Sequence, residues 1–187
     1  QKIFNDRRYF NSVEILTVLL WYLAMFPGRV GYDTTLMFQM MSEGKNTDWW
    51  TGFYFRVLQV LTLNGTSVYL FSALSLLLLF LSIKYLCQIL IVNQSVRKKV
   101  TTFIFVTPFF GVFGTTIAHD VLQVSGIFLL IGASLELRNS KFIFTNKILI
   151  LMTFGVLLNL SVKTGLVYSV ALVALLIVKK TYRQGLF

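Results

Sequence analysis

One long apolar segment limits most strongly how this chain can fold. Residues 67–92 are almost wholly apolar, with Lys84 near the end of the segment. About 20 helical residues cross a hydrocarbon core about 30 Å thick, so the segment is long enough to span a bilayer. The whole chain is 56% hydrophobic and 13% charged, with a mean hydropathy of +0.75, which is too apolar for a soluble domain. We therefore predict an integral membrane protein with an all-α fold, a polytopic helix bundle.

Polar breaks divide the chain into further apolar segments. Pro27-Gly28 ends the first, and Asn64-Gly65 precedes the long one. We expect one transmembrane domain, 1–187, with about six transmembrane helices at 12–27, 67–92, 100–117, 121–136, 148–161 and 164–179, and an outer loop at 28–66. The third to sixth spans are shorter than the roughly 20 residues of a full crossing. Either the bilayer is thinned there, or the outer ends of these helices stop around a protein-lined cavity.

Basic residues orient the expected bundle, because positive charge gathers on the cytoplasmic side of membrane proteins. All but four of the seventeen Lys and Arg residues fall on one side of this threading; the exceptions are Arg29, Lys45, Arg56 and Lys163. Both termini are therefore expected in the cytoplasm, and Arg97, Lys98 and Lys99 in a cytoplasmic turn. The net charge of +10 lies beside the apolar segments and not on a soluble face, so we expect membrane lipids as partners and no nucleic acid.

Helical spacing after Asp33 predicts a short amphipathic surface helix in the outer loop, and the apolar residues of 53–63, with Arg56 and Gln59 among them, predict a second surface or partly inserted helix that ends at Asn64-Gly65. Leu36, Met37, Met40 and Met41 recur at intervals that place them on one face of the first helix. Such a helix would hold the preceding Asp33 at the boundary between lipid and water. The sole cysteine, Cys87, lies inside an apolar segment, so neither an internal disulfide nor a cysteine metal cluster is predicted.

Four polar residues from three separate parts of the sequence fall at outer helix ends in this threading: Asp33, His119, Asp120 and Lys163. A carboxylate beside a membrane is costly unless it is hydrated, paired or functional. Asp33 and Asp120 are accordingly candidate catalytic residues, although two solvated turn residues would fit the sequence equally well. His119 could position a proton, bind phosphate, join the aspartates in a metal site or be a simple loop residue. Lys163 could pair with a phosphate or only face water at a turn.

The aromatic residues and the arginine of the outer loop admit two interpretations each. Trp49, Trp50, Phe53 and Tyr54 fit an interfacial aromatic belt or a platform for a sugar or lipid. Arg56 could anchor anionic headgroups or contact a ligand phosphate. The identity of any metal is unknown from the sequence, which contains no zinc pattern, Walker loop or serine nucleophile elbow.

The order of these features resembles the amino-terminal module of the GT-C class of membrane glycosyltransferases, which use polyprenyl-phosphate sugars. The first span runs straight into FPGRVGYDT, where an acidic residue follows the exit. An outer loop with two surface helices, at about 34–42 and 49–63, precedes the long second span. The segment TIAHDVLQVSGIFLL is similar to an outer turn in bacterial relatives that often holds a Lys-Asp pair. SVKTGLVYSVALVALLIVKK is similar to their pattern of a basic residue, Asn-Gly and an apolar helix.

The resemblance implies sugar transfer from a polyprenyl-phosphate donor on the outer face of a bacterial cytoplasmic membrane. Asp33 would be the general base on the acceptor hydroxyl. Asp120 would assist through substrate hydrogen bonds or a divalent cation, and Lys163, His119 or Arg56 would neutralise the departing phosphate.

Departures from the family pattern keep other functions open. His119 stands where a Lys is expected, Thr164 where an Asn is expected, and Trp49-Trp50 lacks the following His-Pro. Members of the class also usually have further spans, so the sequence fits a module or a piece of a longer protein. The alternatives are a non-catalytic membrane subunit that packs on partner subunits in a larger complex, and a small transporter with outer acidic residues that bind a cation.

Overall fold

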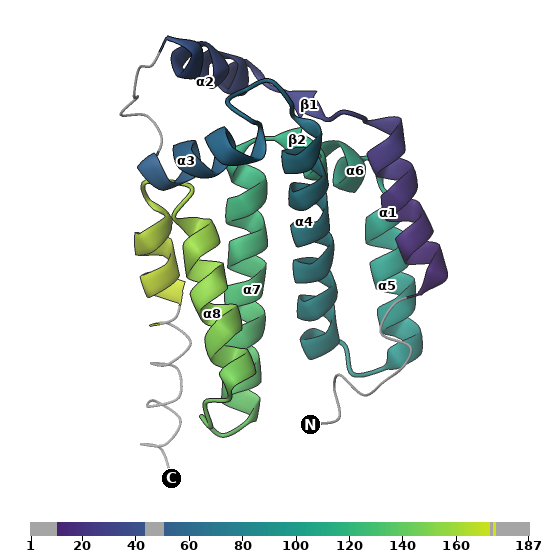
Figure 1. Ribbon diagram of the computed structural model, residues 1–187. Coiled ribbons are helices and arrows are strands. Elements are labelled where there is room, and N and C mark those ends of the chain that lie inside the picture. The colour runs from purple at the N-terminus through teal and green to yellow at the C-terminus, as the bar shows by residue number, and fades with distance from the viewer. Residues whose placement is uncertain (1–10, 44–50, 173, 175–187) are drawn as a thin grey trace.

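The computed structural model describes residues 11–43, 51–172 and 174 of the chain, and this part is mostly helical (Figure 1). Its elements in chain order are α1 (Ser12–Ala24), β1 (Arg29–Val30), α2 (Tyr32–Ser42), α3 (Gly52–Leu61), α4 (Tyr69–Leu90), α5 (Gln94–Val106), α6 (Pro108–Gly114), β2 (Thr116–Ile117), α7 (His119–Asn139) and α8 (Asn146–Asn159). A further helical stretch begins at Gly165.

The long helices run side by side, and the short elements gather at one end of them (Figure 1). Helix α7 packs between α4 and α8, while α1 packs on α4, α5 and α6. Helices α2, α3 and α6 and both strands lie at the end that we call the cap end. The turns between α4 and α5 and between α7 and α8 lie at the opposite end (Figure 1).

Two helices within the described ranges are long and apolar enough to cross a membrane, α4 and α7. Helices α1 and α8 are apolar but shorter. Helix α1 also exposes large apolar side chains, among them Leu16, Leu20 and Leu23, as a lipid-facing helix would. These features point weakly to membrane association, since the buried core helix of a soluble protein can have the same length and composition. The six-span arrangement and the side on which each terminus lies stay predictions.

The predicted third span, 100–117, is wrong as a single helix. Helix α5 begins at Gln94, because the Asn93 side chain accepts hydrogen bonds from the backbone N–H groups of Ser95 and Val96. The basic residues that were expected in a turn therefore lie inside this helix. Pro108 then separates α5 from α6, since proline lacks a backbone N–H and its ring clashes with the preceding turn. The segment ends in β2, which the sequence did not predict.

Two ionic clusters join the helices away from the cap end. Glu14 of α1 is fully buried and contacts Lys84 of α4, and it also accepts a hydrogen bond from the Thr101 hydroxyl of α5. In the second cluster, Glu136 of α7 accepts a hydrogen bond from the Tyr85 hydroxyl at 2.6 Å and lies 2.8 Å from Lys147 Nζ. Each cluster ties together three helices, a cohesion that the apolar pattern of the sequence did not reveal.

Candidate functional site

Two short strands at the cap end bring distant parts of the chain together. Gly28 adopts a φ of +125°, and a Cβ atom at this position would lie 2.7 Å from Ser72 Cβ of α4. This close approach, which only glycine permits, lets the N–H of Arg29 donate to the Thr115 carbonyl at 3.1 Å. Strand β1 then pairs in parallel with β2, with Val30 opposite Ile117. The FPG motif after α1 therefore allows β1 to reach β2 at the cap end.

The strand pair gives Asp33 and Asp120 equivalent positions. Each aspartate comes three residues after the last paired residue of its strand, and each is the second residue of a helix, α2 or α7. The Thr34 hydroxyl donates to the carbonyl of Ile117, which links the start of α2 to the end of β2. Both aspartates are thus first-turn residues of helices, where the helix dipole favours negative charge. The Asp33 side chain itself is outside the described part of the structure.

Asp120 lies beside His119 and close to Tyr54 of α3. The distance from His119 Nε2 to Asp120 Oδ1 is 3.1 Å, and these side chains are 23% and 58% exposed. The Tyr54 ring packs edge-on against the His119 ring with centroids 5.8 Å apart. Tyr54 is only 1% exposed, and its hydroxyl has no hydrogen-bond partner among the described residues. Burial, with a smaller effect from the Asp120 charge, raises the pKa of Tyr54 far above its usual range, so the phenol is neutral.

The turn after α8 joins the same group. Ser161 is buried, and its hydroxyl donates to the carbonyl of His119 at 3.2 Å. The Thr51 hydroxyl donates to the Leu160 carbonyl and also caps α3 by accepting from the N–H of Tyr54 at 3.1 Å. The starts of α3 and α7 and the end of α8 therefore meet. Lys163, two residues beyond Ser161, is exposed on this turn. The three parts of the sequence that hold the predicted site residues Asp33, His119-Asp120 and Lys163 therefore all lie at the cap end.

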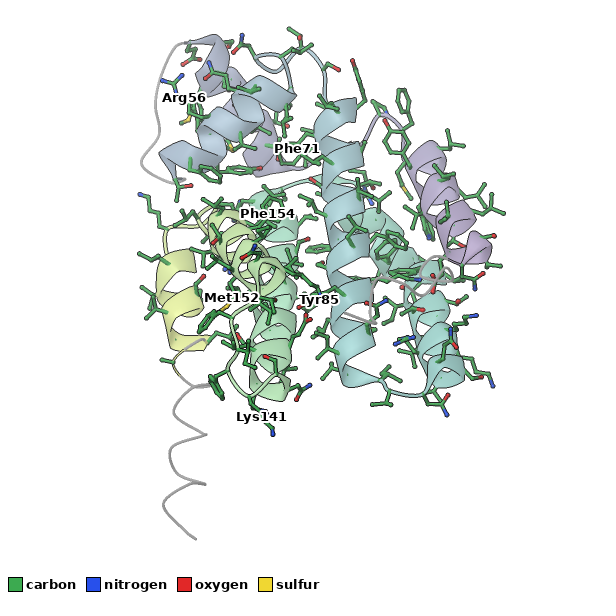
Figure 2. The ribbon with its side chains drawn as sticks, turned by 60° about the horizontal axis from the view of Figure 1, so that its bottom comes forward. Arg56, Phe71, Tyr85, Lys141, Met152 and Phe154 are labelled. Atoms are coloured by element: carbon green, nitrogen blue, oxygen red, sulfur yellow. The ribbon has the colours of Figure 1, made fainter. Side chains whose placement is uncertain are left out.

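Arg56 does not join this group. It is exposed and follows Tyr54 by two residues on α3, which places it on the opposite side of the helix. Its Nη1 donates to Gln59 Oε1 at 3.0 Å, and Figure 2 shows it at the cap end, far from Lys141 at the other end of the bundle. Trp49 and Trp50, the other expected binding residues, lie outside the described residues.

An apolar cavity of about 440 Å³ lies between α4, α5, α6 and α7. Val124 and Phe128 of α7 line it, and they follow Asp120 at intervals of four residues, along roughly one side of the helix. Leu79, Ile83, Phe109 and Phe113 are among the residues from the other helices. The cavity therefore begins about one helical turn from the Asp120 position.

His119 and Asp120 are neighbouring residues of types that bind metals, but no cluster of three or more His, Cys, Asp or Glu residues that could hold a metal ion occurs among the described residues. The identity of any metal therefore stays unknown. No protein-family model, curated protein or solved structure matches the chain. What the site can do must accordingly be argued from its own chemistry.

Sequence reasoning placed Tyr54 in an aromatic group, either an interfacial belt or a platform for a sugar or lipid, and overlooked Thr34, Thr51 and Ser161. A signal for Tyr54 was present, because Tyr54, Leu58 and Leu61 recur at helical spacing along α3, and the first two are buried. The three hydroxyl residues had no such signal. Their partners are backbone carbonyl groups from remote segments, which only the folded chain brings near.

Proposed function

We propose that this chain is the membrane module of a GT-C-type glycosyltransferase, which transfers a sugar from a polyprenyl-phosphate donor on the extracytoplasmic face of a bacterial membrane. The observation that carries the proposal is the parallel pairing of β1 with β2, which sets Asp33 and Asp120 at matching positions after adjacent strands. A transferase needs two such groups at one place, since one must accept a proton while another binds the reacting molecules.

Asp33 is the general base in this mechanism. Its carboxylate takes the proton of the acceptor hydroxyl as the acceptor oxygen bonds to C1 of the sugar. The bond from C1 to the phosphate oxygen breaks, and the polyprenyl phosphate leaves with the electron pair. Lys163 and His119 lie at the cap end and can stabilise the phosphate charge, while Asp120 accepts hydrogen bonds from the substrate.

The apolar cavity supports a lipid-linked donor. It has a nearly continuous hydrocarbon lining, which suits an isoprenoid chain and not a sugar or a nucleotide. It also lies along α7 from Asp120, so a chain in the cavity would place its phosphate near the cap end.

The alternative is a non-catalytic membrane subunit of a larger complex. His119 lies 3.1 Å from Asp120, and this contact could satisfy the carboxylate without a substrate. In that case the cap end is a structural joint and α1 offers its exposed apolar side chains to partner helices.

Transfer by the full chain in lipid nanodiscs tests the proposal. We expect radiolabel to pass from a panel of polyprenyl-phosphate hexoses and pentoses to lipids, glycans or proteins of the source envelope. Asp33→Asn should lower turnover by about 10²- to 10⁴-fold, the usual contribution of a general base. Glu43→Gln, which removes a carboxylate beyond the other end of α2, is the matched control and should keep activity.

Unchanged turnover in folded Asp33→Asn would refute the general-base role. If the wild-type protein transfers no label from the panel but co-purifies with a stable membrane complex, the subunit alternative is correct.

A further inference from the structure

The two ends of the bundle differ in charge among the described residues. The cap end carries as many carboxylates as cations, namely Asp33, Glu43 and Asp120 against Arg29, Arg56 and Lys163. The opposite end, which we call the far end, carries an excess of cations: Lys84, Arg97, Lys98, Lys99, Arg138, Lys141 and Lys147 against Glu14 and Glu136. Both of these carboxylates are paired, with Lys84 and Lys147. The other far-end cations therefore have no carboxylate partner among the described residues.

The turn between α4 and α5 combines an exposed cation with exposed apolar side chains. Val92, in the turn itself, is 93% exposed. Lys99 shares one side of α5 with Val96, Phe103 and Val106, since these residues recur at intervals of three and four, and all of them are exposed. A helix that faces lipid has this pattern, with its lysine at the level of the headgroups and its apolar side chains beside the hydrocarbon.

The turn between α7 and α8 has the same combination. Arg138 and Lys141 are exposed, and Ile143 and Phe144 beside them are 65% and 64% exposed. Figure 2 shows Lys141 at the far end of the bundle. The backbone of the turn is held by the Lys141 N–H, which donates to the Arg138 carbonyl at 3.2 Å. Two turns from separate parts of the chain thus present cations and apolar side chains at one end.

The distance between the two ends matches a bilayer. Helix α4 has 22 residues and α7 has 21, so each is roughly 30 Å long at 1.5 Å per residue, about the thickness of a hydrocarbon core. Both turns lie at the same end of these helices (Figure 1). With the cap end at one membrane surface, the two turns reach the headgroups of the opposite leaflet.

The chemistry of the far end selects an anionic lipid among possible partners. Its phosphate would pair with the exposed cations, and its acyl chains would cover the apolar side chains next to them. A free anion would neutralise the cations but leave Phe103 and Phe144 in water, which is unfavourable. A zwitterionic lipid carries its own ammonium group, which offsets its phosphate and weakens the attraction.

We propose that Lys99, Arg138 and Lys141 bind the headgroups of anionic phospholipids, so that the far end anchors the bundle to one leaflet. This inference goes beyond sugar transfer and does not depend on it, because the far end holds none of the candidate site residues.

Binding of phosphatidylglycerol to the full chain in non-ionic detergent tests the inference. Fluorescence anisotropy of acyl-labelled phosphatidylglycerol should show tighter binding than that of phosphatidylcholine with the same label. Lys99→Gln, Arg138→Gln and Lys141→Gln combined should weaken phosphatidylglycerol binding by about 10²-fold, since each cation near an anionic lipid surface contributes roughly a factor of five. Binding of phosphatidylcholine should not change.

The matched control removes the same charge from the cap end. Arg29→Gln, Arg56→Gln and Lys163→Gln combined should keep the wild-type affinity for phosphatidylglycerol, because carboxylates at that end offset these cations. All six side chains are exposed, so both triple variants should melt close to the wild type. The wild type alone gives a second measurement: its preference for phosphatidylglycerol should largely disappear at about 1 M salt, where the Debye length is about 3 Å.

Three outcomes would overturn the inference. An equal loss of affinity in the two triple variants would show that only the total charge of the protein matters. A wild type that binds the two lipids equally well would show no preference for anionic headgroups. Displacement of phosphatidylglycerol by inorganic phosphate at the same concentration would show a site for the free anion and not for a lipid. Each of these results would leave the proposed sugar transfer untouched.

Discussion

The Glu14 cluster allows a sharp test of what holds α1 in place. Glu14 is fully buried and Lys84 is 6% exposed, and the carboxylate contacts both Lys84 and Thr101. A buried ion pair contributes little over an apolar pair of the same volume, but removal of one partner typically costs about 3–5 kcal/mol. Glu14→Ala should therefore lower the free energy of unfolding by about that amount.

The sole cysteine of the chain provides the assay. Cys87 is buried on α4 and lines the apolar cavity, so a charged, water-soluble thiol reagent, which the apolar lining excludes, labels it much faster as the protein unfolds. At about 2–4 °C per kcal/mol for a chain of this size, the midpoint of thermal labelling should fall by about 10 °C. Lys84→Met combined with Glu14→Leu should recover most of the loss, because no charge is then buried at this position.

The comparison of single and double variants decides the outcome. Val13→Ala, at an exposed neighbouring position of α1, is the control and should melt close to the wild type. A Glu14→Ala midpoint within about 2 °C of the wild type, or a double variant less stable than the single one, would show that the buried ion pair does not hold α1 in place.

Two further predictions concern packing and pH. Gly111→Leu should destabilise the protein by about 1–3 kcal/mol through overpacking, because a Cβ atom at Gly111 would lie 2.1 Å from the Trp21 ring. Gly52→Ala is the control, since a Cβ atom at Gly52 would meet no atom within 4 Å. The same thiol assay measures the stability of both variants. Burial raises the pKa of Tyr54, so the unfolded chain loses this proton near pH 10 while the folded chain keeps it. The free energy of unfolding should therefore fall as pH rises above about 10, and less steeply in Tyr54→Phe; equal slopes in denaturant titrations would contradict this.

Local patterns predicted much of the helical arrangement. The two stretches of the outer loop are helical close to the expected positions, at α2 and α3, because the spacing of their apolar residues matches the helical repeat. The long apolar segment forms α4, and Pro27-Gly28 lies beyond the end of α1. The broken third segment was also within reach, since Pro108 is a known helix breaker.

Contacts between distant parts of the chain could not be predicted from the sequence. Strands of two residues have no recognisable period, so the contact between Val30 and Ile117 had no local signal. Glu14 and Lys84 likewise lie in apolar segments, and the residues around each one do not show whether its charge meets a partner or faces water. The partner depends on which helices pack together.

The sequence by itself determined a strongly apolar, helical chain with its acidic candidates just after turn motifs, because helix periodicity and turn chemistry act over a few residues. The tertiary structure alone decided that the start of α2 is joined to the end of β2, that Tyr54 and not Arg56 packs against His119, and that an apolar cavity begins about one helical turn from Asp120. These features depend on contacts between residues far apart in the chain, whose geometry is set by packing.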